Sequence, residues 1–195
     1  MKTFTLILLS LFTLSLSGQE IEVPYDFPIP KDWGTEKIPF PISFAPAIPY
    51  KGIEEIRFMP GWSKATSDAY WTYAFLWYID GKQKIDVKTL ESHLKIYYEG
   101  LAAATPSVPK EKLIPVVVTN KTEKICDNGE AYYEGTVLML NYMSQKPMTL
   151  NYKISVTTCK GQDKTIVFFK LSPQGYVHYV WKGLDKVCHD FKCKK

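Results

Sequence analysis

Arginine is almost absent from this sequence, and its scarcity excludes one class of partner. Arg57 is the single arginine among 24 basic residues, and the lysines are scattered along the chain. Nucleic-acid-binding proteins usually gather basic side chains on one face, and arginine is favoured there because its guanidinium grips phosphate with two parallel hydrogen bonds. The 20 acidic residues nearly balance the basic ones. We therefore expect no nucleic acid among the partners.

Long hydrophobic runs are also missing. Residues 4–16 are apolar apart from Thr and Ser, and every later apolar segment is interrupted by Lys, Asp or Glu. A helix needs about 20 apolar residues to cross a bilayer, so we expect no transmembrane segment. The stretch follows Lys2 and ends near small residues at Ser15 and Ser17, which is the order of a secretory signal. Residues 1–18 are therefore predicted to be a cleaved signal peptide of an exported, soluble protein, periplasmic or extracellular.

Catalytic and cofactor-binding motifs are the third absence. The sequence has no glycine-rich phosphate loop, no Gly-x-Ser-x-Gly and no His-Glu-x-x-His. Of the three histidines, His178 stands between aromatic residues in Tyr-Val-His-Tyr-Val, where it could line a pocket. We therefore favour binding over catalysis and expect no cofactor.

The four cysteines lie in the C-terminal part of the chain, at Cys126, Cys159, Cys188 and Cys193. An even number in an exported chain predicts two disulfide bonds. We expect Cys126 to pair with Cys159, and Cys188 with Cys193 after the last helix has ended. The alternative is a metal site built from Cys188, His189 and Cys193. Its spacing matches no standard zinc motif, so we expect no metal.

Proline is concentrated near the N-terminus, where seven of the 13 prolines fall between Pro24 and Pro49. Proline removes a backbone donor and disfavours helix in the residue before it, which predicts extended, polyproline-like chain. The segment is also rich in aromatic residues, unlike a disordered linker. We expect residues 19–50 to form an extended Pro-rich and aromatic arm that precedes a single domain over residues 51–195.

The rest of the chain alternates short strand patterns with two helical ones. Asp86 is a good N-cap for a helix whose apolar residues recur at helical spacing. The predicted helices are 87–104 and 179–190, and the predicted strands are 53–59, 69–79, 114–119, 132–142, 148–158 and 164–171. Short links between the last three strands favour antiparallel neighbours. The expected fold is α+β, a mainly antiparallel sheet of about five to six strands, with one central amphipathic helix and a C-terminal helix packed on it.

The predicted strand 69–79 is the most suggestive feature for function. Alternate residues place Trp71, Tyr73, Phe75 and Trp77 in one row, and the other face is also apolar. An uncovered row would be a stacking platform for sugar rings or other planar ligands. A row covered by the helix would be core, because strands favour aromatic residues and these bury large areas. Both interpretations are open at this point.

These patterns favour a non-catalytic domain that binds an unknown protein or a carbohydrate-like ligand through an aromatic surface. The candidate ligand-binding residues are Trp62, Trp71, Tyr73, Trp77 and His178. One alternative is a secreted or periplasmic hydrolase whose site joins His178 to Glu54 or Glu55. A second alternative is a structural or assembly protein that lends its Pro-rich arm to a neighbouring subunit.

Overall fold

Seven antiparallel strands form the main sheet of this computed structural model, in the order β2-β3-β4-β8-β7-β6-β5. The structure describes residues 24–126 and 130–194, so the predicted signal peptide, residues 1–18, lies outside the described residues. The strands of the main sheet are β2 (Gly34–Pro39), β3 (Gly52–Phe58), β4 (Tyr73–Asp80), β5 (Val117–Ile125), β6 (Ala131–Asn141), β7 (Lys146–Thr158) and β8 (Lys164–Ser172). Two short strands, β1 (Tyr25–Asp26) and β9 (Lys192–Cys193), pair separately.

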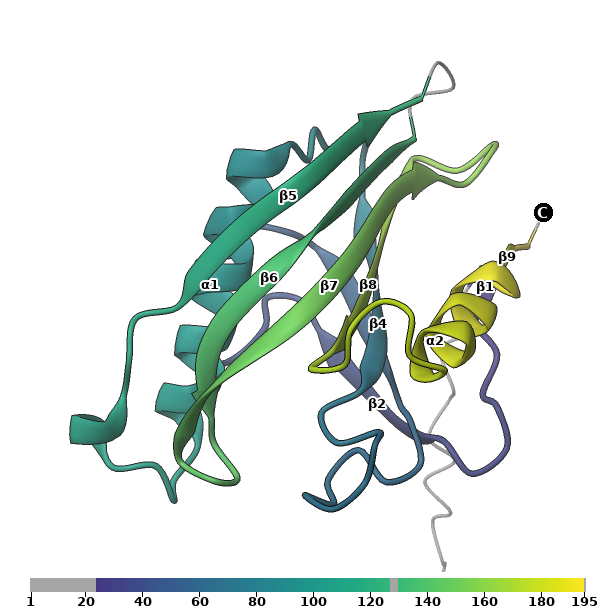
Figure 1. Cartoon of the computed structure of the whole chain (residues 1–195). Coiled ribbons are helices and arrows are strands. Elements are labelled where there is room, and N and C mark those ends of the chain that lie inside the picture. Colours follow the sequence, from purple (N-terminus) through teal and green to yellow (C-terminus); the bar gives the residue numbers. More distant parts are fainter. Residues whose placement is uncertain (1–23, 127–129, 195) are drawn as a thin grey trace, which may run out of the picture.

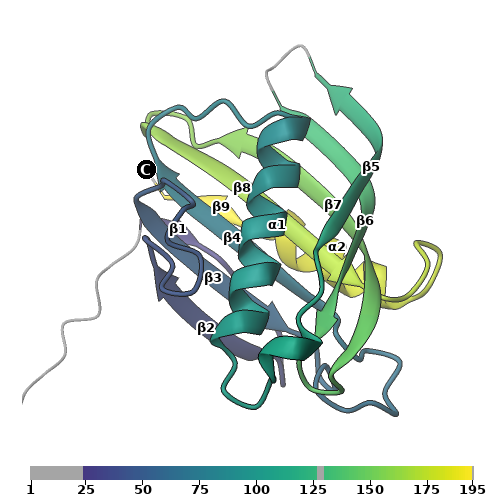
Figure 2. The ribbon, with the colours of Figure 1, turned by 90° about the vertical axis from the view of Figure 1, so that its left-hand side faces the viewer.

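Two helices cover opposite faces of this sheet, α1 (Val87–Ala104) and α2 (Val180–His189) (Figure 1). Figure 2 shows α1 across the front of the sheet and α2 behind it. The predicted start of α1 is confirmed, because the Asp86 carboxylate accepts a hydrogen bond from the Thr89 backbone N–H at 3.0 Å. A short 3₁₀ turn, η1 (Lys110–Lys112), follows α1. Within the described residues, no helix is both long and apolar enough to cross a bilayer.

Strand β4 is buried on both faces, which decides between the two interpretations of its aromatic row. Tyr73, Phe75 and Trp77 pack in one cluster with residues of α1. Ala74 and Leu76 face the other way, toward the clusters that contain α2 and the N-terminal segment. Trp71, Tyr73, Phe75 and Trp77 are each at most 5% exposed. The aromatic row is therefore core beneath α1 and forms no flat, open platform.

The N-terminal segment departs from the expected Pro-rich arm. β2 is an edge strand paired with β3, and β1 pairs with β9, so the strand count exceeds the expected five to six. The reason lies in the spacing of the prolines. Residues 31–38 contain none, and their backbone N–H groups are free to join a ladder between Pro30 and Pro39.

The single arginine anchors this segment to the sheet. Nη2 of Arg57 donates to the Phe27 carbonyl at 2.7 Å and to Glu55 Oε2 at 2.9 Å, and its Nε donates to the Pro28 carbonyl at 3.0 Å. The Tyr25 hydroxyl donates to Glu55 Oε1 at 2.6 Å. Burial alone would raise the pKa of Glu55, but these hydrogen bonds and the Arg57 charge together lower it. The pair thus holds the segment against the face of the sheet that α2 also covers.

The disulfide pairing expected from the sequence is wrong. Cys159 is bonded to Cys193, with a Cα–Cα distance of 5.8 Å, whereas Cys126 and Cys188 are free thiols. After α2 ends, the chain enters β9 and pairs with β1, which carries Cys193 away from Cys188 toward the turn after β7. Cys188 stays on the packed side of α2, where burial raises the pKa of its thiol to about 12.

The anchoring role of Arg57 can be tested by replacing its guanidinium group with an ammonium group, which keeps the positive charge. Arg57→Lys loses the parallel donors to Phe27 and Pro28 and leaves buried carbonyls unpaired, so we expect a loss of about 2 kcal/mol in the free energy of unfolding. Lys37 is the other ion-pair partner of Glu55, and its side chain is 57% exposed. Lys37→Ala should therefore lower the free energy of unfolding by less than about 1 kcal/mol. Urea denaturation measures both. Equal costs would contradict the anchoring role.

The single bridge predicts a specific thiol count. Denatured, unreduced protein should take up iodoacetamide at Cys126 and Cys188 and at neither Cys159 nor Cys193. Because the bridge closes a loop of 34 residues, Cys193→Ser should lower the free energy of unfolding by about 4 kcal/mol. Peptide mass spectrometry identifies the alkylated residues. A protein with no alkylated cysteine would carry two bridges and would contradict the free thiols at Cys126 and Cys188.

Candidate functional site

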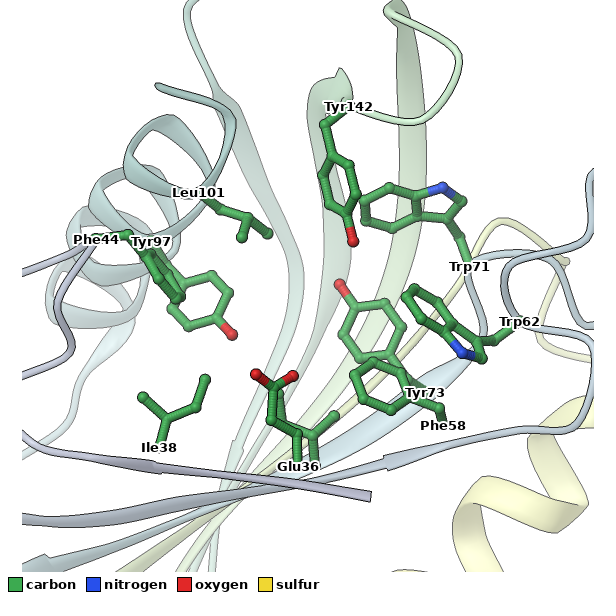
Figure 3. A pocket seen from close by; sticks show the side chains of 11 residues that line it. Glu36, Ile38, Phe44, Phe58, Trp62, Trp71, Tyr73, Tyr97, Leu101 and Tyr142 are labelled. Atoms are coloured by element: carbon green, nitrogen blue, oxygen red, sulfur yellow. The ribbon is translucent and has the colours of Figure 1, made fainter. Parts of the chain in front are cut away.

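An aromatic pocket opens at the end of the buried row, between β2, the C-terminal half of α1 and the loop that joins β3 to β4 (Figure 3). Its cavity volume is about 80 Å³. The walls are made mainly of aromatic rings, with aliphatic side chains between them and one carboxylate. The lining residues are Glu36, Ile38, Phe44, Ile56, Phe58, Trp62, Trp71, Tyr73, Tyr97, Leu101 and Tyr142.

The loop between β3 and β4 supplies two tryptophans in fixed positions. The backbone N–H of Trp71 donates to the Trp62 carbonyl at 2.7 Å, which ties the two ends of the loop together. The Trp62 ring stacks on Phe58 with centroids 4.3 Å apart, and Trp71 meets Tyr142 edge-on at 5.0 Å. Trp71 has a φ of 53°, in the left-handed region that bulky residues rarely adopt. Its buried indole N–H has no hydrogen-bond partner in the part of the chain that the structure describes.

A close approach between a loop and α1 positions the opposite wall. A Cβ atom at Gly100 would lie 1.9 Å from the Phe44 carbonyl oxygen, so only glycine lets the 40–51 loop touch the helix here. Ala45 and Ile48 are buried beside this contact. The Phe44 ring then packs edge-on against Tyr97, with centroids 5.0 Å apart.

Behind the Tyr97 wall lies a buried carboxylate without a cation. Glu54 is fully buried and accepts hydrogen bonds from the Trp77 indole N–H at 2.5 Å and the Tyr97 hydroxyl at 2.8 Å. Burial raises the pKa of Glu54 to about 7, although both hydrogen bonds oppose that rise. The charge of Glu36 adds to the rise. Tyr97 therefore connects the pocket wall to a carboxyl group that titrates near neutral pH.

Glu36 stands at the open side of the pocket, on edge strand β2. The register pairs Glu36 with Ile56 and Ile38 with Glu54, which places all four side chains on the face that α1 covers. Figure 3 shows the Glu36 carboxylate directed from β2 into the cavity. It makes no ion pair or hydrogen bond with any other described residue. An unpaired negative charge therefore faces the aromatic rings.

The structure brings three of the five candidate binding residues together. Trp62, Trp71 and Tyr73 line the pocket. Trp77 lies deeper in the row, where it donates to Glu54 and does not line the cavity. His178 lies just before α2 and does not line the pocket. Its ring packs on Tyr179, with centroids 4.6 Å apart.

The structure does not bring His178 together with Glu54 or Glu55, as the hydrolase alternative requires. Glu54 faces α1, whereas His178 precedes the helix on the opposite face, so the sheet separates them. The oxygens of Glu55 are engaged by Tyr25, Arg57 and Lys37.

The alternative metal site also lacks support. Cys193 is bonded to Cys159, which removes one of the three side chains that the site would need. Among residues 24–126 and 130–194, no group of three or more His, Cys, Asp or Glu side chains could hold a metal ion.

Sequence reasoning missed Glu36, Phe44, Tyr97 and Tyr142 as members of the site. Tyr97 was visible only as part of the apolar face of a helix, and Tyr142 only as the end of a predicted strand. Glu36 and Phe44 lay inside the expected arm. No local pattern marks these residues, because they meet only through the pairing of β2 with β3 and the packing of α1.

Comparisons with known proteins do not extend this description. No family model and no curated protein sequence matches the chain. Among solved structures, it is similar to the crystal structure of LpqN, which is involved in cell envelope biogenesis of Mycobacterium tuberculosis. The identity is 12%, the TM-score is 0.35, and the match covers 88% of this chain and 83% of that chain. A likeness this remote carries nothing about the activity or ligand of the chain.

Glu54 predicts a pH dependence of stability. Between its usual pKa of 4.5 and the folded value of about 7, the folded carboxyl keeps a proton that the unfolded one has released. The free energy of unfolding should therefore fall as pH rises through this window, by about 3 kcal/mol for this group. Glu54→Gln should remove that part of the fall. Urea denaturation at about pH 5 and about pH 8 measures the difference between variant and wild type.

The control for this experiment is Glu111→Gln, because Glu111 is exposed on the 3₁₀ turn η1. This variant should lose as much stability with rising pH as the wild type. A Glu54→Gln protein that follows the wild-type curve would show that Glu54 is ionised across the whole range.

Proposed function

We propose that this protein is an exported, non-catalytic binding module that holds a small ligand in the aromatic pocket. The observation that carries the proposal is the convergence of rings from separate segments on one cavity. The rings come from the 40–51 loop, β3, the β3–β4 loop, β4, α1 and the turn after β6. A concave lining of aromatic rings with few polar groups is typical of small-molecule sites, and the cavity volume of about 80 Å³ limits the enclosed part of a ligand to a small group.

The pocket walls are held rigid, which also supports binding. Trp71 combines a left-handed backbone with an unpaired, buried N–H. Each feature costs about 1–3 kcal/mol, and such costs persist mainly where the surrounding structure imposes them, often at functional sites. The Trp71–Trp62 backbone hydrogen bond and the close contact at Gly100 fix both sides of the cavity. Preorganised walls lower the entropic cost of binding.

Export is part of the proposal. The disulfide between Cys159 and Cys193 is compatible with an oxidising compartment. The signal-like order of residues 1–18 points the same way. A soluble protein in the periplasm or outside the cell would meet small ligands directly.

The assembly alternative has less support, because the N-terminal segment is used within its own chain. β2 completes the edge of the main sheet, and Arg57 and Glu55 hold residues 25–28 against it. Lending this segment to a neighbouring subunit would break these contacts. We therefore favour the pocket over the segment as the functional surface.

Ligand binding can be tested with three probes of different chemistry: phenol, methyl glucoside and choline. Saturation-transfer NMR should detect at least one of them on the wild-type protein, with a dissociation constant of about 1 mM or tighter. Trp62→Ala and Tyr142→Ala should weaken that binding about tenfold, since each removes one aromatic wall of the pocket.

Tyr179→Ala is the matched control, because Tyr179 is 59% exposed and lies before α2. It should leave binding unchanged, and thermal unfolding should show that all three variants are folded. The proposal fails if none of the probes binds, or if the pocket variants bind as well as the control.

A further inference from the structure

The walls of the pocket carry charge of one sign only. Of the described residues that line it, Glu36 is the single charged one, and none is Lys, Arg or His. Glu54 adds a second acidic group behind Tyr97. On the opposite face of the same strand pair, by contrast, Glu55 is matched by Arg57 and Lys37. The acidic groups are therefore balanced by cations on one face of β2 and β3 and unbalanced on the other.

The charge of Glu36 reaches the surrounding rings. Burial raises the pKa of Tyr142, and the negative charge of Glu36 raises it further. Burial also raises the pKa of Tyr97, the charge of Glu54 raises it further, and Glu36 makes a smaller contribution. Aromatic faces are themselves negative because of the ring quadrupole. The lining therefore combines negative ring faces with the solvent-exposed carboxylate of Glu36 and contains no cation among its described residues.

The polar groups of the pocket are few. The Tyr97 hydroxyl donates a hydrogen bond to Glu54, and the Tyr73 and Tyr98 hydroxyls share a hydrogen bond of 2.7 Å. Besides the unpaired Trp71 indole N–H, the Glu36 carboxylate and the Tyr142 hydroxyl remain, and Figure 3 shows both directed into the cavity. A sugar would leave most of its hydroxyls unpaired here, and an anion would be repelled by Glu36.

Resting on the proposed function above, we propose that the ligand carries an alkylated ammonium group, held among the aromatic faces with Glu36 as its counter-ion. Alkyl groups spread the positive charge and remove N–H donors, so the cation needs ring faces more than hydrogen-bond acceptors. A primary ammonium, with three donors to satisfy, fits this pocket less well. Aromatic walls beside one carboxylate suit a soft cation of small size.

The test compares choline with dimethylbutanol, the neutral analogue in which a tert-butyl group replaces trimethylammonium. The two have nearly the same shape, so their affinities differ through the charge. We expect choline to bind the wild-type protein about tenfold more tightly, as measured by saturation-transfer NMR or calorimetry. Glu36→Gln should weaken choline binding about fivefold to tenfold and leave dimethylbutanol binding unchanged. Glu111→Gln, an exposed carboxyl outside the pocket, is the control for general charge effects and should change neither affinity.

The outcomes separate this inference from the proposed function. Equal affinities for choline and dimethylbutanol, both lost in Trp62→Ala, would overturn the cationic ligand and leave the binding pocket in place. Choline binding that Glu36→Gln does not weaken would overturn the role of Glu36 as counter-ion. If neither compound binds and phenol and methyl glucoside also fail, the pocket itself is not a binding site.

Vesicles distinguish the two sources of such a group. Co-sedimentation with phosphatidylcholine vesicles, but not with phosphatidylglycerol vesicles, and release by free choline would identify a lipid headgroup. Binding of free choline without co-sedimentation would identify a soluble ammonium compound. Either result supports the shared chemistry, whereas equal sedimentation with both vesicles, unaffected by choline, would contradict it.

Discussion

Strand β4 must be covered on both faces, and the rest of the structure depends on that constraint. Its side chains alternate between a large aromatic row and a second apolar row, and all but Asp80 are buried. No single helix can cover two faces of a sheet. The chain meets this requirement with α1 on one side and with α2 and the N-terminal segment on the other. The hydrogen bonds of the Arg57–Glu55 pair hold the N-terminal segment against the second face.

The pocket follows from the same constraint where the cover ends. α1 packs over Phe75 and Trp77. Near Tyr73 and Trp71, which are still at most 5% exposed, its C-terminal half leaves a cavity of about 80 Å³. There the loops that carry Phe44 and Trp62 form walls and do not fill the space. The site is thus continuous with the core, and its aromatic character is that of the core. What distinguishes it from packed core is the unpaired Glu36 carboxylate at its open side.

The sequence predicted the elements whose signals are local. Asp86 and the apolar spacing after it located α1, and short turns located the β6-β7-β8 hairpins. It did not predict β2, because the proline content of the region outweighed the eight proline-free residues between Pro30 and Pro39. The pairing of Cys159 with Cys193 depends on β9 crossing to β1, a contact between the two ends of the described chain. Trp62, Trp71 and Tyr73 were predicted as ligand-binding residues from their aromatic character alone and line the pocket, whereas Glu36 and Tyr142 join them only through tertiary packing.

The strand order has a consequence for how the chain folds. β2-β3-β4 and β5-β6-β7-β8 are two meanders in which each strand pairs with its neighbour in sequence, so both can form from local contacts. The two meanders meet only at β4 and β8, where Tyr73 lies opposite Leu171. Pairing strands this far apart in sequence raises the contact order. Its loop-closure entropy must be offset by many contacts formed together, which slows folding. The seam between β4 and β8 is also where Phe75 of the aromatic row stacks on Phe169, so the pairing of the two meanders also completes the core.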